Sequence, residues 1–170
     1  MRLLLLCLLL LAACAPPPPP ETPTPATSTP PPTIAPAPTT AYPWTDERAV
    51  MESLCFESVY DAAGQTFVLH SAEELTHFFN LADNSRLCRR PVQRAGFDFS
   101  GERTLAGLWT RGRGCTARHD VRGFQQDDVA RTFVIVLRFV TEGECGYELV
   151  QPFWVGLTLP RDYDIRIRVE

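Results

Sequence analysis

The chain has 170 residues and a formal net charge of −4 at pH 7, from 16 basic and 20 acidic side chains. Every basic residue is an arginine, so catalysis through a Schiff base on a lysine side chain is excluded. The slight acidic excess provides no basic surplus for a nucleic-acid surface, and no nucleic-acid partner is expected.

The N-terminus carries a short apolar run over residues 3–13, which closes with Leu11-Ala12-Ala13-Cys14. The run suits a secretory signal but is far shorter than the roughly 20 residues that cross a bilayer. It resembles the signal peptide of bacterial lipoproteins, in which such a cysteine is lipidated and becomes the mature N-terminus. The resemblance implies a signal peptide over residues 1–14, a lipid anchor on Cys14 and a location in the cell envelope, outside the cytoplasm. An ordinary secretory signal is the alternative.

Residues 15–43 consist mostly of proline, threonine and alanine. Such a segment has little apolar surface to bury, and its prolines favour the extended polyproline II conformation. We predict a disordered spacer that holds a single domain, residues 44–170, away from the lipid surface.

Four cysteines remain in that domain: Cys55, Cys88, Cys115 and Cys145. An even number in an exported domain predicts two disulfides, for which three pairings are possible. We expect Cys55–Cys88 and Cys115–Cys145, because each pair brackets one contiguous half of the domain. A zinc site that uses these cysteines with His119 is the alternative, but no Cys-x-x-Cys pair supports it. No metal and no cofactor are expected.

The first half of the domain predicts a hairpin and then a helix. Residues 54–60 are predicted as a strand and residues 66–69 as its hairpin partner, with a turn between them. Ser71 and Glu74 form a capping box, the signature of a helix start. Apolar residues then recur with helical spacing at Leu75, Phe78, Phe79 and Ala82, and residues 83–85 end the helix.

The second half predicts strands throughout. Alternating or continuous apolar residues indicate strands at residues 97–99, 104–110, 116–124, 132–140, 153–159 and 163–169. Both faces of the segment 132–140 are apolar, so we expect the helix to cover its second face. The predicted fold class is α+β, a mainly antiparallel sheet with one amphipathic helix near the N-terminal side of the domain.

No pattern of catalytic residues stands out. Serine nucleophiles lack the Gly-x-Ser-x-Gly turn, and the neighbours His119 and Asp120 point to opposite faces of their predicted strand. Glu142 and Glu144 could act as a carboxylate pair, but a solvated loop explains them better. We therefore predict a protein that is not an enzyme.

Arginines gather in two segments, one after the helix and one around a predicted hairpin. Because guanidinium groups bind carboxylates in a bidentate manner, these segments are a candidate surface for an acidic partner. A solvated surface is the alternative. The candidate residues are Arg86, Arg89, Arg90, Arg94, Arg111, Arg113, Arg118 and Arg122. Trp109, Trp154 and Tyr147 are candidates for a sugar or protein contact, although aromatic residues in strands usually lie in the core.

Three stretches resemble the C-terminal domain of the PrcB-like lipoproteins, accessory subunits of a surface protease complex. They are F-V-L-H-S-A-E-E-L-T-H-F-F at 67–79, F-D-F-S-G-E-R-T-L-A-G at 97–107 and Q-P-F-W-V-G-L-T-L-P at 151–160, and the resemblance covers residues 66–169. The family's glycine-glycine-aromatic turn is replaced by Gly-Arg-Gly-Cys-Thr at 112–116. The resemblance implies a protein without catalytic residues that binds and stabilises a partner.

These patterns together predict a lipid-anchored extracytoplasmic binding protein. Its expected partner is another envelope or secreted protein such as a protease, and its contact with the membrane is expected through the lipid alone. A small-ligand or glycan-binding module on the cell surface is the alternative. An open apolar or arginine-lined patch would favour the first interpretation, and a closed aromatic pocket would favour the second.

Overall fold

The computed structural model describes residues 42–170. The predicted signal peptide, the lipidation site at Cys14 and all but the last two residues of the predicted spacer lie outside these residues. Within residues 42–170, no helix has the length and apolar character needed to cross a membrane.

Seven strands, two α-helices and one 3-10 helix make up the described chain. In order they are β1 (Trp44–Asp46), η1 (Arg48–Met51), α1 (Phe56–Ala62), β2 (Thr66–Leu69), α2 (Ala72–Asn84), β3 (Arg103–Arg113), β4 (Thr116–Asp127), β5 (Thr132–Glu142), β6 (Glu148–Thr158) and β7 (Asp164–Val169).

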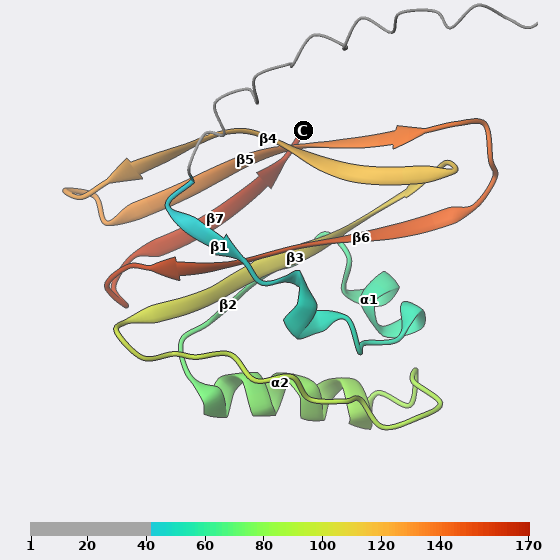
Figure 1. Ribbon diagram of the computed structural model, residues 1–170, viewed down its shortest axis with the longest axis horizontal. Helices are drawn as coiled ribbons and strands as arrows, with labels where there is room; N and C mark the ends of the chain where they lie inside the picture. Colours follow the sequence, from blue (N-terminus) through green and yellow to red (C-terminus); the bar gives the residue numbers. More distant parts are fainter. Residues whose placement is uncertain (1–41) are drawn as a thin grey trace, which may run out of the picture. The chain divides into compact units, whose positions relative to one another are not determined.

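The strands form two sheets (Figure 1). β1, β6, β3 and β2 make a four-stranded antiparallel sheet in that order, and β4, β5 and β7 make a three-stranded one. β4 and β5 are antiparallel, but β5 and β7 run parallel, because the strand between them in sequence, β6, belongs to the other sheet. The predicted mainly antiparallel α+β fold is therefore confirmed. The parallel β5–β7 pair was not predicted, because consecutive strands joined by short turns are expected to pair antiparallel.

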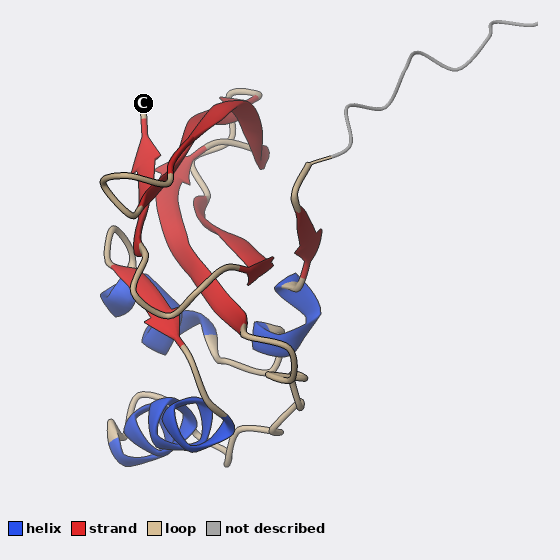
Figure 2. Cartoon of the chain, turned by 90° about the vertical axis from the view of Figure 1, so that its left-hand side faces the viewer, coloured by secondary structure: helices blue, strands red, loops and turns tan. Residues whose placement is uncertain are grey.

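The elements stack in three layers, with helices, the four-stranded sheet and the three-stranded sheet in turn (Figures 1 and 2). Successive side chains of β3 supply two separate cores, because a strand alternates its faces. Leu105 and Trp109 pack with the helices, whereas Ala106 and Leu108 pack with residues of β5 and β7. This division buries both faces of β3 and leaves the helices on one side only.

The helix predicted from the capping box is present as α2. The Ser71 hydroxyl accepts a hydrogen bond from the Glu74 backbone at 3.1 Å, and the Glu74 carboxylate accepts one from the His70 backbone at 2.6 Å. Leu75, Phe79 and Ala82 of this helix are buried. These residues pack on the four-stranded sheet, so the prediction that the helix covers β5 is wrong.

Residues 54–60 were predicted as a strand, and this prediction is wrong, since most of them belong to α1. In so short a segment the apolar spacing fits both the helical repeat and the strand repeat. Tertiary packing then decides which of the two structures forms. Val59 is buried in the helical core, while Glu57 and Asp61 stay exposed. β2 consequently pairs with β3 rather than with residues 54–60.

Residues 97–99 form no strand either. Phe97 and Phe99 pack against the helical core and against each other, with ring centroids 4.7 Å apart. Their alternation therefore reflects two inward-pointing rings in a loop that has no strand partner.

Both expected disulfides are present. Cys55–Cys88 joins the residue that precedes α1 to the loop that follows α2. Cys115–Cys145 joins the β3–β4 turn to the β5–β6 loop. The first bridge fixes the two helices relative to each other, and the second joins the two connections that link the sheets.

Candidate functional site

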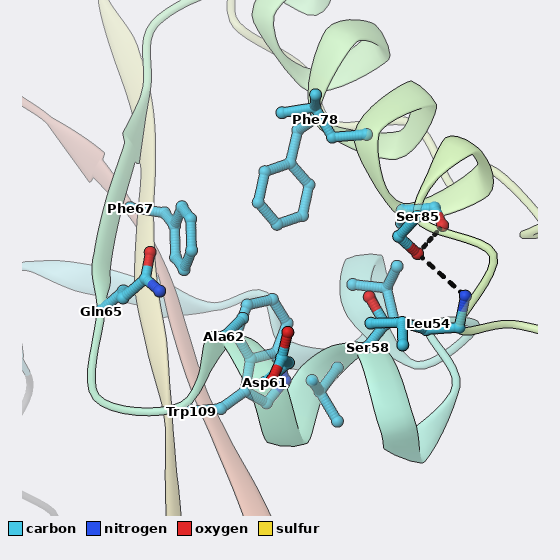
Figure 3. Close-up of a pocket in the computed structure, with 13 residues that line it drawn as sticks. Leu54, Ser58, Asp61, Ala62, Gln65, Phe67, Phe78, Ser85 and Trp109 are labelled. Atoms are coloured by element: carbon cyan, nitrogen blue, oxygen red, sulfur yellow. Dashed lines mark hydrogen bonds between the residues drawn. The ribbon is translucent and has the colours of Figure 1, made fainter.

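An apolar cleft of about 230 Å³ opens between α1, α2 and β2 (Figure 3). Its walls are mainly aliphatic and aromatic, with a few polar side chains at the rim. The lining residues are Leu54, Ser58, Val59, Asp61, Ala62, Gln65, Phe67, Phe78, Leu81, Ala82, Ser85, Leu87 and Trp109. The cleft exists because α1 and α2 pack on the same sheet face without closing on each other.

Aromatic rings form the base of the cleft. Phe78 of α2 lies edge-on to Phe67 of β2, with centroids 5.1 Å apart, and stacks parallel to Trp109 at 6.1 Å. Trp109 is only 2% exposed and touches the buried Trp154, with centroids 4.9 Å apart. The base is therefore part of the rigid core, which makes the cleft a preformed feature of the fold.

The rim carries exposed apolar side chains. Leu81 is 57% exposed and Leu87 is 38% exposed. The loop that bears Leu87 is held against α2, because the Arg94 guanidinium donates to Asn80 at 2.6 Å and to Asp83 at 2.9 Å. Hydrogen bonds from the Val92 backbone and from Arg94 lower the pKa of Asp83, so this contact persists at neutral pH.

A second hollow, of about 530 Å³, continues the cleft along β2 towards the start of α2. The two hollows share Phe67, Phe78 and Leu81. Acidic and polar residues of α2 line the second hollow: Glu73, Glu74 and His77. The two together form one groove between α2 and β2, which we call the α2–β2 groove.

The first arginine segment lies where the α2–β2 groove ends. Arg94 is used internally, as described above, whereas Arg86, Arg89 and Arg90 are exposed and form no ion pair among residues 42–170. Arg86 directly follows Ser85 and precedes Leu87, both of which line the cleft. Arg86 is thus free to meet a partner beside the cleft, whereas Arg89 and Arg90 line a separate hollow with Ser53, Cys55 and Glu57.

The second arginine segment is mostly engaged with its own neighbours. Arg113 pairs with Glu148 at 3.1 Å, and Arg118 pairs with Asp120 and with Glu142. Arg111 lies over the Tyr60 ring at 5.0 Å. Arg122 is exposed and has no ion pair within the described residues. The structure therefore divides the candidate arginine surface, and of its first segment only Arg86 directly adjoins residues that line the cleft.

A separate pocket of about 270 Å³ lies beside β1, β4 and β6. Its lining combines aromatic and charged side chains: Tyr42, Trp44, Asp46, Arg48, Arg118, His119, Val121, Gln151, Pro152, Phe153, Trp154 and Val155. Tyr42 and Trp44 stack with their ring centroids 4.6 Å apart. Arg48 is paired with Asp46 at 2.7 Å, so the opposite charges at the pocket offset each other.

His119 is the one histidine that lines this pocket. Its Nε2 lies 2.9 Å from the Thr110 hydroxyl, and the ring also donates to the Pro152 carbonyl. Burial lowers the pKa of His119 to about 4, outweighing the Pro152 hydrogen bond that raises it. Asp120 lies on the opposite face, with Arg118, as strand alternation predicted. His119 is therefore a neutral, half-buried and hydrogen-bonded residue at neutral pH.

Acidification is expected to destabilise the domain through His119. The unfolded histidine takes up its proton near pH 6.5 and the folded one near pH 4, so the unfolded state binds more protons between these values. The contribution of His119 to stability is complete above pH 6.5 and declines as the pH falls towards 4. With an allowance for solvent at the ring, we expect a loss of about 2 kcal/mol.

Urea unfolding at pH 7 and at pH 4.5 measures this effect. His119→Gln provides the control, because an amide can replace both hydrogen bonds and does not titrate. The loss of stability on acidification should be smaller in His119→Gln than in the wild type by the amount assigned to His119. An equal loss in both proteins would contradict the assignment.

The remaining candidates occupy structural or solvated positions. The His70 ring lies 3.1 Å from the buried Thr104 hydroxyl. Trp109 and Trp154 lie in the core, as strand aromatics usually do, while Tyr147 is 67% exposed. Glu142 pairs with Arg118, and Glu144 is exposed in a loop. Among residues 42–170, no cluster of histidine, cysteine and acidic side chains has the arrangement of a metal site.

Comparison of the chain with models of protein families, with curated proteins and with solved structures found no match. The resemblance to the PrcB-like lipoproteins therefore stays a prediction. The groove itself was not predicted, because residues 54–60 were assigned to a strand and no second helix was expected. The one sequence signal was Leu81, an apolar residue outside the apolar face of the predicted helix, with Leu87 in the loop that follows.

Proposed function

We propose that this protein is a lipid-anchored, extracytoplasmic binding subunit that holds another envelope or secreted protein in the cleft between α1, α2 and β2. The observation that carries the proposal is the combination of a buried aromatic base with exposed apolar side chains at Leu81 and Leu87, which line the cleft. Contiguous exposed apolar surface with a polar border is typical of protein interaction sites. Anchoring pockets of this kind concentrate binding energy.

Binding rather than catalysis is further supported by the state of the titratable groups. His119 is neutral and its Nε2 is engaged with the Thr110 hydroxyl, and general acid–base catalysis needs a group free to exchange a proton with substrate. Arg86 beside the cleft, with Arg89 and Arg90 further along the same loop, would add electrostatic attraction to an acidic border on the partner. An accessory role, such as stabilising a protease, rests on the resemblance of residues 66–169 to the PrcB-like lipoproteins.

The test is capture of partners by the native lipoprotein from crosslinked membranes. Leu81→Gln is expected to reduce capture about tenfold, because a leucine side chain contributes about 1.5–3 kcal/mol when it becomes buried. Glutamine is a good helix former, so α2 is expected to be retained. Val129→Gln is the matched control, since Val129 is 97% exposed in the β4–β5 turn, away from the cleft.

Thermal unfolding should show that both variants keep the stability of the wild type. Equal capture by Leu81→Gln, Val129→Gln and the wild type would contradict the proposal. Hydrolysis of a peptide or glycoside by the purified protein, lost in His119→Ala, would replace it with an enzymatic function.

A small-ligand or glycan-binding module is the second candidate, favoured by the pocket beside the stacked pair Tyr42 and Trp44. Stacked aromatic faces with nearby charged groups suit a sugar ring. In that case Trp44→Ala should abolish binding of the ligand while Leu81→Gln leaves it unchanged.

A further inference from the structure

β2 differs from the other edge strands of the described residues. Sheet edges expose unpaired backbone groups, and proteins usually protect them with charges, bulges or proline. β4 and β7 carry several charged residues, β4 is interrupted by a bulge at residues 121–123, and β1 ends in Asp46. β2 has the sequence Thr-Phe-Val-Leu, with no charge, and it pairs on one side only.

The α2–β2 groove extends along this free edge. Phe67 and Leu69 pack towards the helices, whereas Val68 packs towards the three-stranded sheet. All three line the hollow between β2 and α2. The hollow therefore takes in residues from both faces of β2, as expected for a space that reaches the edge of the strand.

The far wall of the groove gives it a charge. Glu73 and Glu74 line it, and neither forms an ion pair within residues 42–170. Glu74 is occupied by the backbone of His70, which leaves Glu73 exposed and available. A partner segment in this groove would therefore be favoured if it placed a basic side chain near the start of α2.

We propose that the partner supplies an extended peptide segment that adds to the free edge of β2 as a further strand. One of its apolar side chains would enter the space between Phe67, Phe78 and Leu81, and a basic side chain would reach Glu73. Main-chain hydrogen bonds to a sheet edge supply affinity in such complexes, and alternate side chains supply specificity. The inference rests on the proposed function and specifies how the partner is held.

The dimensions of the groove suit this mode of binding. The four residues of β2 span about 13 Å, and the 13 residues of α2 span about 20 Å. An extended segment of about six residues therefore covers the length of α2. Its central residues would face β2, and its ends would reach beyond the strand.

A synthetic peptide tests the inference without knowledge of the natural partner. The probe is a fluorescent eight-residue peptide of alternating valine and threonine with an arginine at each end, and anisotropy measures its binding to the intact domain. Two N-methylated versions carry methyl groups on alternate residues, in complementary sets. Because only one set of amides can face β2, one version should bind about tenfold more weakly and the other nearly as well as the parent.

A charge exchange tests the assigned orientation of the basic side chain. Glu73→Arg should weaken binding of the arginine peptide and strengthen binding of the same peptide with glutamate at its ends. Glu144→Arg makes the same charge change in the exposed β5–β6 loop. This variant should still bind the arginine peptide more tightly than the glutamate peptide, as the wild type does.

Absence of peptide binding at millimolar concentration, or equal binding by both N-methylated versions, would overturn strand addition. If Glu73→Arg still preferred the arginine peptide to the glutamate peptide as the wild type does, the contact between Glu73 and the basic side chain would be overturned. Capture from membranes that still depends on Leu81 would, in either case, leave the proposed function standing and show that the partner docks by side chains alone.

Discussion

Gly107→Ala is expected to destabilise the domain by about 3 kcal/mol or more, at the upper end of what overpacking costs. Gly107 lies in the middle of β3, where Trp154 of the neighbouring strand crosses it. A Cβ atom at this position would lie 2.2 Å from Cδ2 of Trp154 and 2.6 Å from the Phe153 carbonyl oxygen. Both distances are far inside van der Waals contact, so either the ring or the backbone has to move.

Neither movement is easily accommodated. The Trp154 side chain is fully buried, and its ring lies 4.9 Å from that of Trp109 and 6.1 Å from that of Phe67. Its indole nitrogen has no hydrogen-bond partner among residues 42–170, and its contacts there are aromatic packing. Because the same rings support the base of the cleft, any folded Gly107→Ala protein should also bind its partner less well.

Urea unfolding measures the effect, and Gly123→Ala serves as the control. A Cβ at Gly123, which lies in β4, would meet no atom within 4 Å. That substitution should be close to neutral, since alanine restricts the unfolded chain and meets no clash in the folded one. Similar stabilities for the two variants would show that Gly107 is not a packing requirement.

Removal of either disulfide is expected to cost about 3–4 kcal/mol by the chain-entropy estimate. The paired cysteines are 33 residues apart in Cys55–Cys88 and 30 in Cys115–Cys145, so the two losses should be similar. A loss of this size is a large share of the stability of a typical domain. Paired replacement of the cysteines by alanine, followed by urea unfolding, measures each contribution.

The two bridges should differ in their effect on binding. Cys55–Cys88 joins α1 to the loop after α2, and these segments form two walls of the cleft. Cys115–Cys145 joins the two connections that link the sheets, and neither cysteine lines the cleft. At a temperature where both variants are folded, capture should fall in the Cys55/Cys88 variant and not in the Cys115/Cys145 variant. Equal capture by the two would mean that the cleft is not where the partner binds.

Much of the fold follows from local sequence patterns. The capping box and helical spacing of residues 71–82 predicted α2, and apolar alternation predicted the long strands from β3 to β7 within a few residues. These signals are strong because each element buries one continuous face over several turns or residue pairs. The cysteine pairing followed from the division of the domain into two halves, each of which a bridge closes.

The features that depend on tertiary contacts were not predictable in the same way. α1 has only seven residues, and its helical character depends on packing of Val59 in the core. The parallel β5–β7 pair arises because β6 joins the other sheet. Pairing of Arg113 with Glu148 brings together residues 35 apart in sequence. The cleft combines these effects, since it is the space that two independently packed helices leave between them.

The most direct measurement of the central claim is site-specific photocrosslinking in the native envelope. A photoreactive side chain at position 81 lies on the cleft rim, and one at position 129 lies in the β4–β5 turn. Both native side chains are exposed, at 57% and 97%, so neither change should disturb folding. Binding in the cleft predicts a discrete protein adduct from position 81 and none from position 129. Adducts of equal yield from both positions, or none from position 81, would contradict it.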